Sequence, residues 1–129
     1  MKVLLFNIEG YKRNRHYLSS LIRSEKPLIL LLQEVWLAYH DQAILSNDFP
    51  EYNFHLSTPD MFENSEDKVV HANQVWHGAL VAWHDDLQTS ITPITTTHER
   101  YAAILLRIPN STQAILIVSL YAPTSGKDD

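Results

Sequence analysis

Short apolar segments alternate with polar turns over most of the chain. Residues 2–6 form an apolar run that ends at Asn7, and residues 28–32 form a second, continuous run that follows Pro27. Between them, the apolar residues of 14–25 recur at helical spacing. This pattern predicts a strand, a helix and a second strand that is buried on both faces, and we expect the two strands to be parallel.

The second half of the chain is dominated by strand patterns. Residues 38–45 suit a short helix, and residues 57–75 form a long polar stretch without periodicity, which is typical of functional or mobile loops. A βαβ unit followed by antiparallel strands indicates one mixed α/β or α+β domain. The predicted strands are residues 52–56, 79–83, 101–108 and 113–120, and the last two form a hairpin.

Composition excludes several classes of protein. With 129 residues, 45% of them hydrophobic and 19% charged, the chain has the content of a single globular domain that needs no metal merely to fold. The lack of cysteine excludes disulfides, thiolate zinc sites and a cysteine nucleophile. Because no apolar run reaches the roughly 20 residues of a membrane helix and no signal peptide is recognisable, we expect an intracellular protein without a membrane partner.

Charge limits where a nucleic acid could bind. A formal net charge of -5 argues against a broad surface for phosphate contacts. One dense basic cluster remains, at Lys12, Arg13, Arg15 and His16. We expect Arg13 and Arg15 to contact backbone phosphate at the rim of a site, with a solvated helix start as the alternative.

Polar side chains end the two predicted parallel strands. Glu34 follows the 28–32 run, and Asn7 follows the first strand. Ligands usually bind at the carboxyl ends of such strands, and a carboxylate there suits a hard cation such as Mg²⁺. Taken singly, Glu34 could be the first solvated residue of a loop and Asn7 a turn former. Taken together, the two side chains are predicted to project into one crevice. Their spacing does not indicate which reaction takes place there.

Two further residues lie near the open end of the predicted hairpin. Arg100 precedes its first strand and Tyr121 follows its second, so an arginine could hold a phosphate and a tyrosine could position one. The alternatives are a solvated strand end and an aromatic residue that closes the core. Gly78 marks either a close backbone approach or a bend. Residues 47–49 and 84–86 are interpreted as turns, and no role is assigned to His16, His40, His55, His71 or His77.

Five segments together resemble the endonuclease/exonuclease/phosphatase family in their order and spacing. The Gln33-Glu34-Val35-Trp36-Leu37 form and the Tyr121-Ala122-Pro123 ending are most similar to the endonuclease domains of non-LTR retrotransposons, which themselves resemble apurinic/apyrimidinic endonucleases. The segments are Phe6–Gly10, Leu32–Leu37, Trp76–Trp83, Glu99–Tyr101 and Tyr121–Pro123.

The resemblance implies an α+β fold, a four-layered αββα sandwich of which this chain is the amino-terminal portion. It implies hydrolysis of phosphodiester bonds in DNA with Mg²⁺ or Mn²⁺, Glu34 as the metal ligand, and Asn7, Glu34 and Tyr121 as the catalytic residues. Arg100 matches a position near the site and is expected to bind substrate. We therefore expect Asn7, Glu34, Arg100 and Tyr121 to converge at one end of the sheets.

Departures from the family pattern qualify this expectation. The family's Asp-x-Asn and final Asp-His elements belong after Tyr121-Ala122-Pro123, but the chain stops at Asp129, and Thr124 stands where many relatives carry Asn. We therefore expect a truncated domain of residues 1–129 that is inactive alone. Its missing part would supply the second sheet, so the sheet with residues 28–32 and 115–120 would be uncovered and prone to aggregation.

The expected partners are DNA, a downstream catalytic half and a reverse-transcriptase region, with a nuclear location if the protein is a retrotransposon endonuclease. Two other functions stay open. One is a non-catalytic remnant that acts as a binding module, and the other is a family phosphatase that acts on small phosphoesters.

Overall fold

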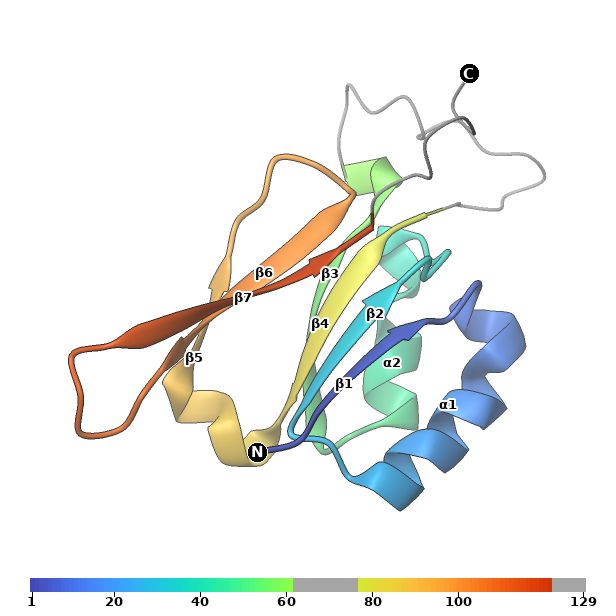
Figure 1. The fold of residues 1–129 in the computed structure, drawn as a ribbon. Helices are drawn as coiled ribbons and strands as arrows, with labels where there is room; N and C mark the ends of the chain where they lie inside the picture. Colours follow the sequence, from blue (N-terminus) through green and yellow to red (C-terminus); the bar gives the residue numbers. More distant parts are fainter. Residues whose placement is uncertain (62–76, 122–129) are drawn as a thin grey trace.

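Two β-sheets pack face to face in the computed structural model, which describes residues 1–61 and 77–121 (Figure 1). The four-stranded sheet has the order β1-β2-β4-β3 and is made of Val3–Asn7 (β1), Ile29–Gln33 (β2), Tyr52–Ser57 (β3) and Ala79–His84 (β4). The three-stranded sheet has the order β5-β6-β7 and is made of Ile91–Ile94 (β5), Tyr101–Arg107 (β6) and Ala114–Leu120 (β7).

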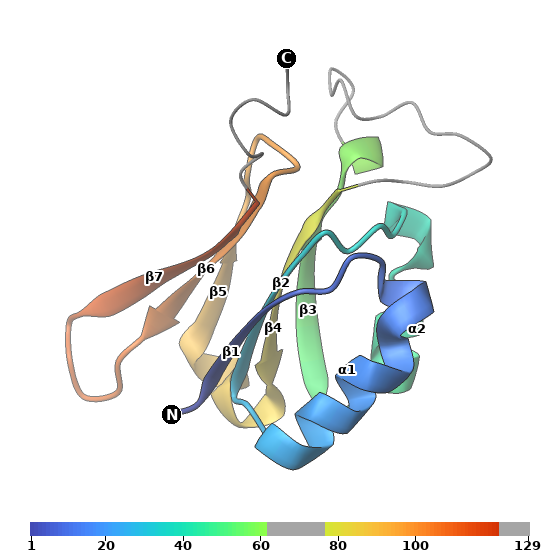
Figure 2. The ribbon, with the colours of Figure 1, turned by 45° about the vertical axis from the view of Figure 1, so that its right-hand side comes forward.

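Helices cover one face of the four-stranded sheet, and the three-stranded sheet covers its other face (Figure 2). The α-helices are Tyr11–Glu25 (α1) and Ala43–Asp48 (α2), and 3₁₀ turns lie at Tyr39–Asp41 (η1), Pro59–Met61 (η2) and Asp85–Ser90 (η3). None of the helices in residues 1–61 and 77–121 has the length and apolar character needed to cross a membrane.

Strand pairing confirms the main sequence predictions. β1 and β2 are parallel, β2 and β4 are antiparallel, and β6 and β7 form the expected hairpin. β5 was not predicted, because its four residues contain Pro93. Proline is tolerated there because β5 is an edge strand of its sheet. Of the long loop expected at residues 57–75, only residues 57–61 lie in the described part of the chain.

The continuous apolar sequence of β2 reflects burial on both faces. Leu30 and Leu32 pack into the core between the sheet and the helices, and both are about 1% exposed. Ile29 is fully buried in a second core between the two sheets, where it lies with Val81 of β4 and Ile104 of β6. β2 is therefore an inner strand of the sheet that forms the middle of three layers.

The expectation that residues 28–32 and 115–120 share one uncovered sheet is wrong. β2 and β7 lie in different sheets, and this chain itself supplies strands of the second sheet. The predicted α+β class with two packed sheets is confirmed, and helices, four-stranded sheet and three-stranded sheet make up three of the four expected layers. Apolar side chains are still exposed on β1 and β7: Val3, Leu5, Ile115, Leu116, Val118 and Leu120.

Candidate functional site

Glu34 is buried at the carboxyl end of β2, with a relative exposure of 8%. Both of its carboxylate oxygens are engaged. The indole Nε1 of Trp36 donates to Oε2 at 2.7 Å, and Nδ1 of His77 lies 3.0 Å from Oε1. The alternative interpretation of Glu34 as a solvated loop residue is therefore wrong, and its carboxylate is held in a fixed orientation.

Asn7 ends the neighbouring strand β1 and pairs in register with Gln33, the residue before Glu34. Its side chain is exposed, and its Oδ1 accepts a hydrogen bond from the backbone N–H of Glu9 at 3.2 Å. The loop that follows β1 stays next to the loop that follows β2, because Gly10 N–H donates to the carbonyl of Glu34 at 2.8 Å. Asn7 and Glu34 thus lie at adjacent strand ends, as the sequence predicted.

Tyr121 and Arg100 reach the same place from the other sheet. The ring of His77 stacks on the ring of Tyr121, with centroids 5.3 Å apart and planes inclined by 27°. The guanidinium of Arg100 lies 6.0 Å from the centre of the Tyr121 ring, and Tyr121 N–H donates to the Arg100 carbonyl at 2.7 Å. A continuous row of contacts therefore runs between the two sheets. We call it the Glu34 cluster, and its members are Glu34, Trp36, His77, Tyr121 and Arg100.

A buried polar contact fixes the two sheets against each other beside this row. The Gln33 amide donates to Ser119 Oγ at 2.9 Å, and Ser119 Oγ donates to the carbonyl of Leu32 at 2.9 Å. Both side chains are buried, so each hydrogen bond forms away from water. Because Gln33 precedes Glu34 and Ser119 lies two residues before Tyr121, this contact sets the spacing between the carboxylate and the tyrosine.

The two arginines expected at the rim have different surroundings. Arg13 is exposed, and its guanidinium lies 5.8 Å from the centre of the Trp36 ring, beside the Glu34 cluster. Arg15 instead forms an ion pair with Asp48 of α2, with Nη2 and Oδ1 2.5 Å apart. The structure therefore brings Arg13, but not Arg15, to the cluster.

Asp48 also accepts a hydrogen bond from the buried Tyr11 hydroxyl at 2.6 Å. Burial and the Asp48 carboxylate raise the pKa of Tyr11 above its ordinary value. Burial alone would raise the pKa of Asp48, but the hydrogen bonds from Arg15 and Tyr11 and the charge of Arg15 outweigh it and lower that pKa. This polar group joins α1 to α2 and stabilises the helical layer.

Backbone conformation around Glu34 is unusual. Among residues 1–61 and 77–121, eight have a positive φ, and six of these surround the cluster. Left-handed conformations are unfavourable for side chains other than glycine, and they concentrate at functional sites because the surrounding structure must hold them. Gly10 also leaves room for Trp36, since a Cβ on Gly10 would lie 2.6 Å from Trp36 Cε3. The six residues are Glu9, Gly10, Glu34, Trp36, His77 and Gly78.

Sequence reasoning missed the contribution of His77, which was assigned no role. Histidine spacing gives no sign of it, because its partner lies 43 positions away. Extension of the β2–β4 ladder would have found it, since Val35 N–H donates to Gly78 O at 3.2 Å and Trp36 N–H to His77 O at 2.8 Å. His84, by contrast, accepts from the backbone N–H of Asp86 at 3.1 Å, which confirms the predicted polar turn.

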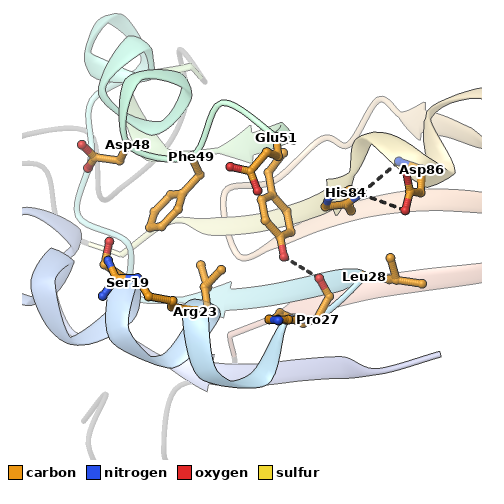
Figure 3. A pocket seen from close by; sticks show the side chains of 12 residues that line it. Ser19, Arg23, Pro27, Leu28, Asp48, Phe49, Glu51, His84 and Asp86 are labelled. Atoms are coloured by element: carbon orange, nitrogen blue, oxygen red, sulfur yellow. Dashed lines mark hydrogen bonds and ion pairs between the residues drawn. The ribbon is translucent and has the colours of Figure 1, made fainter.

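A separate cleft of about 460 Å³ lies between α1, the α2–β3 turn and the end of β4 (Figure 3). Arg23 of α1 and Phe49 and Glu51 of the α2–β3 turn line it, and His84 and Asp86 flank it. None of its lining residues belongs to the Glu34 cluster. Its charges are of both signs and do not converge on one point, so the chemistry of this chain points to Glu34 instead.

The donor set at Glu34 fits a divalent cation held by one carboxylate. Within residues 1–61 and 77–121, no group of three or more His, Asp or Glu side chains lies close enough together to hold a metal ion. Mg²⁺, however, is often bound by one or two carboxylates together with water and substrate phosphate. A carboxylate has about four lone-pair positions, so the donors Trp36 and His77 leave positions for a cation.

The solved structures that share this fold include those of three proteins. AP endonuclease LMAP from Leishmania major has a TM-score of 0.67 and 17% identity, and the match covers 96% of this chain and 40% of that one. The endonuclease domain of TRAS1, a telomere-specific non-LTR retrotransposon, has a TM-score of 0.58 and 18% identity over 94% of this chain and 45% of that domain. The 3′ phosphatase NExo from Neisseria, bound to product DNA hairpin, has a TM-score of 0.57 and 13% identity. That match covers 90% of this chain and 40% of that one.

This chain thus spans less than half the length of each of these three structures. A comparison with curated protein sequences finds no match. The family model for the endonuclease/exonuclease/phosphatase family matches residues 4–126, which is nearly the whole sequence. The chain therefore belongs to the endonuclease/exonuclease/phosphatase family.

Proposed function

We propose that the complete protein hydrolyses phosphodiester bonds in DNA with Mg²⁺ or Mn²⁺, as the endonuclease of a non-LTR retrotransposon, and that it acts in the nucleus. The observation that carries this proposal is the buried Glu34 carboxylate, fixed by two N–H donors at the carboxyl end of a central strand. Family membership supports phosphoester hydrolysis. Likeness of fold to an AP endonuclease and to the TRAS1 endonuclease domain favours DNA as the substrate.

Each residue of the cluster has a role in this proposal. Glu34 holds the cation through the lone pairs that Trp36 and His77 leave, and the bound cation would supply Lewis-acid activation of the phosphoryl oxygen and of the attacking water. Tyr121 contacts the scissile phosphate through its hydroxyl, and Arg100 stabilises the negative charge that develops there. Asn7 contributes an amide at the adjacent strand end.

In this proposal, the described residues supply the metal ligand and the phosphate contacts. No group of three or more His, Asp or Glu side chains gathers among them, whereas phosphoryl transfer needs the metal, an oriented water and a base held together. We propose that a downstream catalytic half supplies the base and that a reverse-transcriptase region belongs to the same protein. The 129-residue chain alone is then inactive, because groups that act as a unit have strongly non-additive effects.

Nicking of supercoiled plasmid by the full-length protein tests the proposal. We expect nicking with Mg²⁺ or Mn²⁺, none with EDTA, and a loss of roughly 100-fold or more in Glu34→Gln. The control is Glu51→Gln, an exposed glutamate in the turn before β3. Release of phosphate from small monoesters without nicking would instead favour a family phosphatase. DNA binding without cleavage of either substrate would favour a non-catalytic binding module.

Salt dependence of DNA binding separates the two arginines. Arg13, beside Trp36, is proposed to contact a phosphate. In a plot of the logarithm of the DNA association constant against the logarithm of salt concentration, Arg13→Glu should therefore make the negative slope shallower by about one unit. Arg15, although also expected from sequence to contact phosphate, is paired with Asp48. Arg15→Glu should therefore destabilise the fold, which urea unfolding measures. If the slope for Arg13→Glu equals that of the wild type, the assignment of Arg13 to a phosphate contact is wrong.

A further inference from the structure

We propose that His77 is a positioning residue that couples Glu34 to Tyr121, so that the metal carboxylate and the phosphate-contacting hydroxyl keep one relative arrangement. The inference rests on the function proposed above, because it assigns His77 a part in that same site. Its evidence is the position of one imidazole between two residues that come from different sheets.

The first contact fixes the carboxylate. An ionised carboxylate can only accept hydrogen bonds, so Nδ1 of His77 is the donor to Oε1 of Glu34 at 3.0 Å, and a neutral imidazole suffices. Trp36 donates to the other oxygen at 2.7 Å. Two donors on two different oxygens restrict rotation of the carboxylate, and groups that orient a metal ligand in this way commonly tune its affinity for the metal.

The second contact fixes the tyrosine. The His77 ring stacks on the Tyr121 ring at 5.3 Å, and the Arg100 guanidinium lies 6.0 Å from that same ring. Stacking on a ring restricts the direction of the phenol, and hence the place of its hydroxyl. A displacement of the imidazole would therefore move both the carboxylate and the hydroxyl.

The backbone holds the imidazole in place. His77 has φ +66° and is followed by Gly78 at φ +94°, and the carbonyls of both residues accept backbone hydrogen bonds from the segment after Glu34. These bonds extend the β2–β4 ladder past the last strand residues. A residue in a left-handed conformation persists only where its surroundings hold it, so this local geometry is maintained at an energetic cost.

Two substitutions of His77 separate its two contacts. His77→Asn places an amide donor near the position of Nδ1 but removes the ring, and His77→Phe keeps a ring but removes the donor. The measurements use the full-length protein: Mn²⁺ affinity by electron paramagnetic resonance, in the absence of DNA, and kcat and KM for plasmid nicking. Because phenylalanine is disfavoured at positive φ, thermal unfolding is measured for every variant.

We expect His77→Phe to weaken Mn²⁺ binding by roughly tenfold or more, as loss of groups that orient metal ligands does. His77→Asn should keep the Mn²⁺ affinity within about twofold and lower kcat by about threefold or more through the lost stack. The control is His40→Ala, an exposed histidine on η1 whose ring is paired with Asp41. It should leave both measurements unchanged.

Glu34→Gln in the same assays distinguishes failure of this inference from failure of the proposed function. If Glu34→Gln binds Mn²⁺ like the wild type, the metal site itself is wrong. If Glu34→Gln loses Mn²⁺ while folded His77→Phe and His77→Asn match the wild type, His77 has no positioning role. Equal changes in both His77 variants would also overturn the inference, because its two contacts would then not be separable.

Discussion

Strands β2 and β7 have similar apolar sequences but opposite surroundings. β2 reads Ile-Leu-Leu-Leu-Gln and is buried except at Leu31, which is partly buried. β7 reads Ala-Ile-Leu-Ile-Val-Ser-Leu and is exposed except at Ile117 and Ser119. Helices and the second sheet cover the two faces of β2, but β7 lies at the edge of its sheet. An apolar run therefore predicts a strand, but it does not show whether other parts of this chain bury that strand. The burial depends on the strand's place in the sheet and on the elements packed against it.

The largest expected effect tests the buried strand. Leu30→Ala removes a side chain that is 1% exposed in the core under the helices, and it should lower the free energy of unfolding by about 3 kcal/mol. Leu116→Ala, on β7, is the matched control and should cost less than roughly 0.5 kcal/mol, because Leu116 is 60% exposed. Urea unfolding of both variants measures the difference. Equal costs would show that β7 is covered in solution.

The next effect concerns the point where the two strands meet. Ser119→Ala leaves the buried Gln33 amide without its acceptor, and this should cost about 2 kcal/mol in the free energy of unfolding. Ser20→Ala, at an exposed position of α1, is the control and should have almost no effect. If Ser119→Ala proves as stable as the wild type, the contact between Gln33 and Ser119 does not hold the sheets together.

A smaller, pH-dependent effect is expected on the helix-covered side of β2. Since the pKa of Asp48 is lowered in the folded state, its stabilisation is present above the ordinary carboxyl pKa and is lost as pH falls through the lowered value. Asp48→Asn should thus cost about 1 kcal/mol at pH 7, and the difference from the wild type should shrink as pH falls below about 4. Urea unfolding at several pH values measures it, with Glu51→Gln as the control. A difference that does not change with pH would contradict this account of Asp48.

The smallest effect on stability is expected on the outer side of β7. Leu116→Lys combined with Leu120→Lys changes two side chains that are 60% and 58% exposed, so the free energy of unfolding should stay within roughly 0.5 kcal/mol. The same change should reduce aggregation, measured by light scattering, because it interrupts an exposed apolar patch. A large loss of stability would mean that these leucines are buried against another part of the protein.

Sequence patterns predicted most of the elements because local rules determine them. The run of residues 28–32, the helix that ends before Pro27 and the hairpin of β6 and β7 all follow from periodicity and turn residues. β5 was missed because four residues that include Pro93 give no strand pattern. The division of the strands between two sheets was also missed, since it depends on contacts between distant segments rather than on local periodicity.

The candidate site was predicted in part for the same reason. Glu34 and Asn7 follow from their positions at strand ends, and Tyr121 and Arg100 follow from the resemblance to the family. His77 could not be found from spacing, because the ladder between β2 and β4 brings it to Glu34. The catalytic and substrate-binding roles of Asn7, Glu34, Arg13, Arg100 and Tyr121 stay predictions until variants are measured.

The left-handed residues around Glu34 have a consequence for directed evolution. Trp36 and His77, at φ +55° and +66°, hold conformations that glycine or asparagine would adopt at lower energy. A library selected for thermostability alone should therefore enrich glycine and asparagine at positions 36 and 77, at the expense of the Trp36 indole that donates to Glu34 and of the His77 ring that stacks on Tyr121. Stability and activity would then be improved by different residues at the same positions, a trade-off often found at strained active sites.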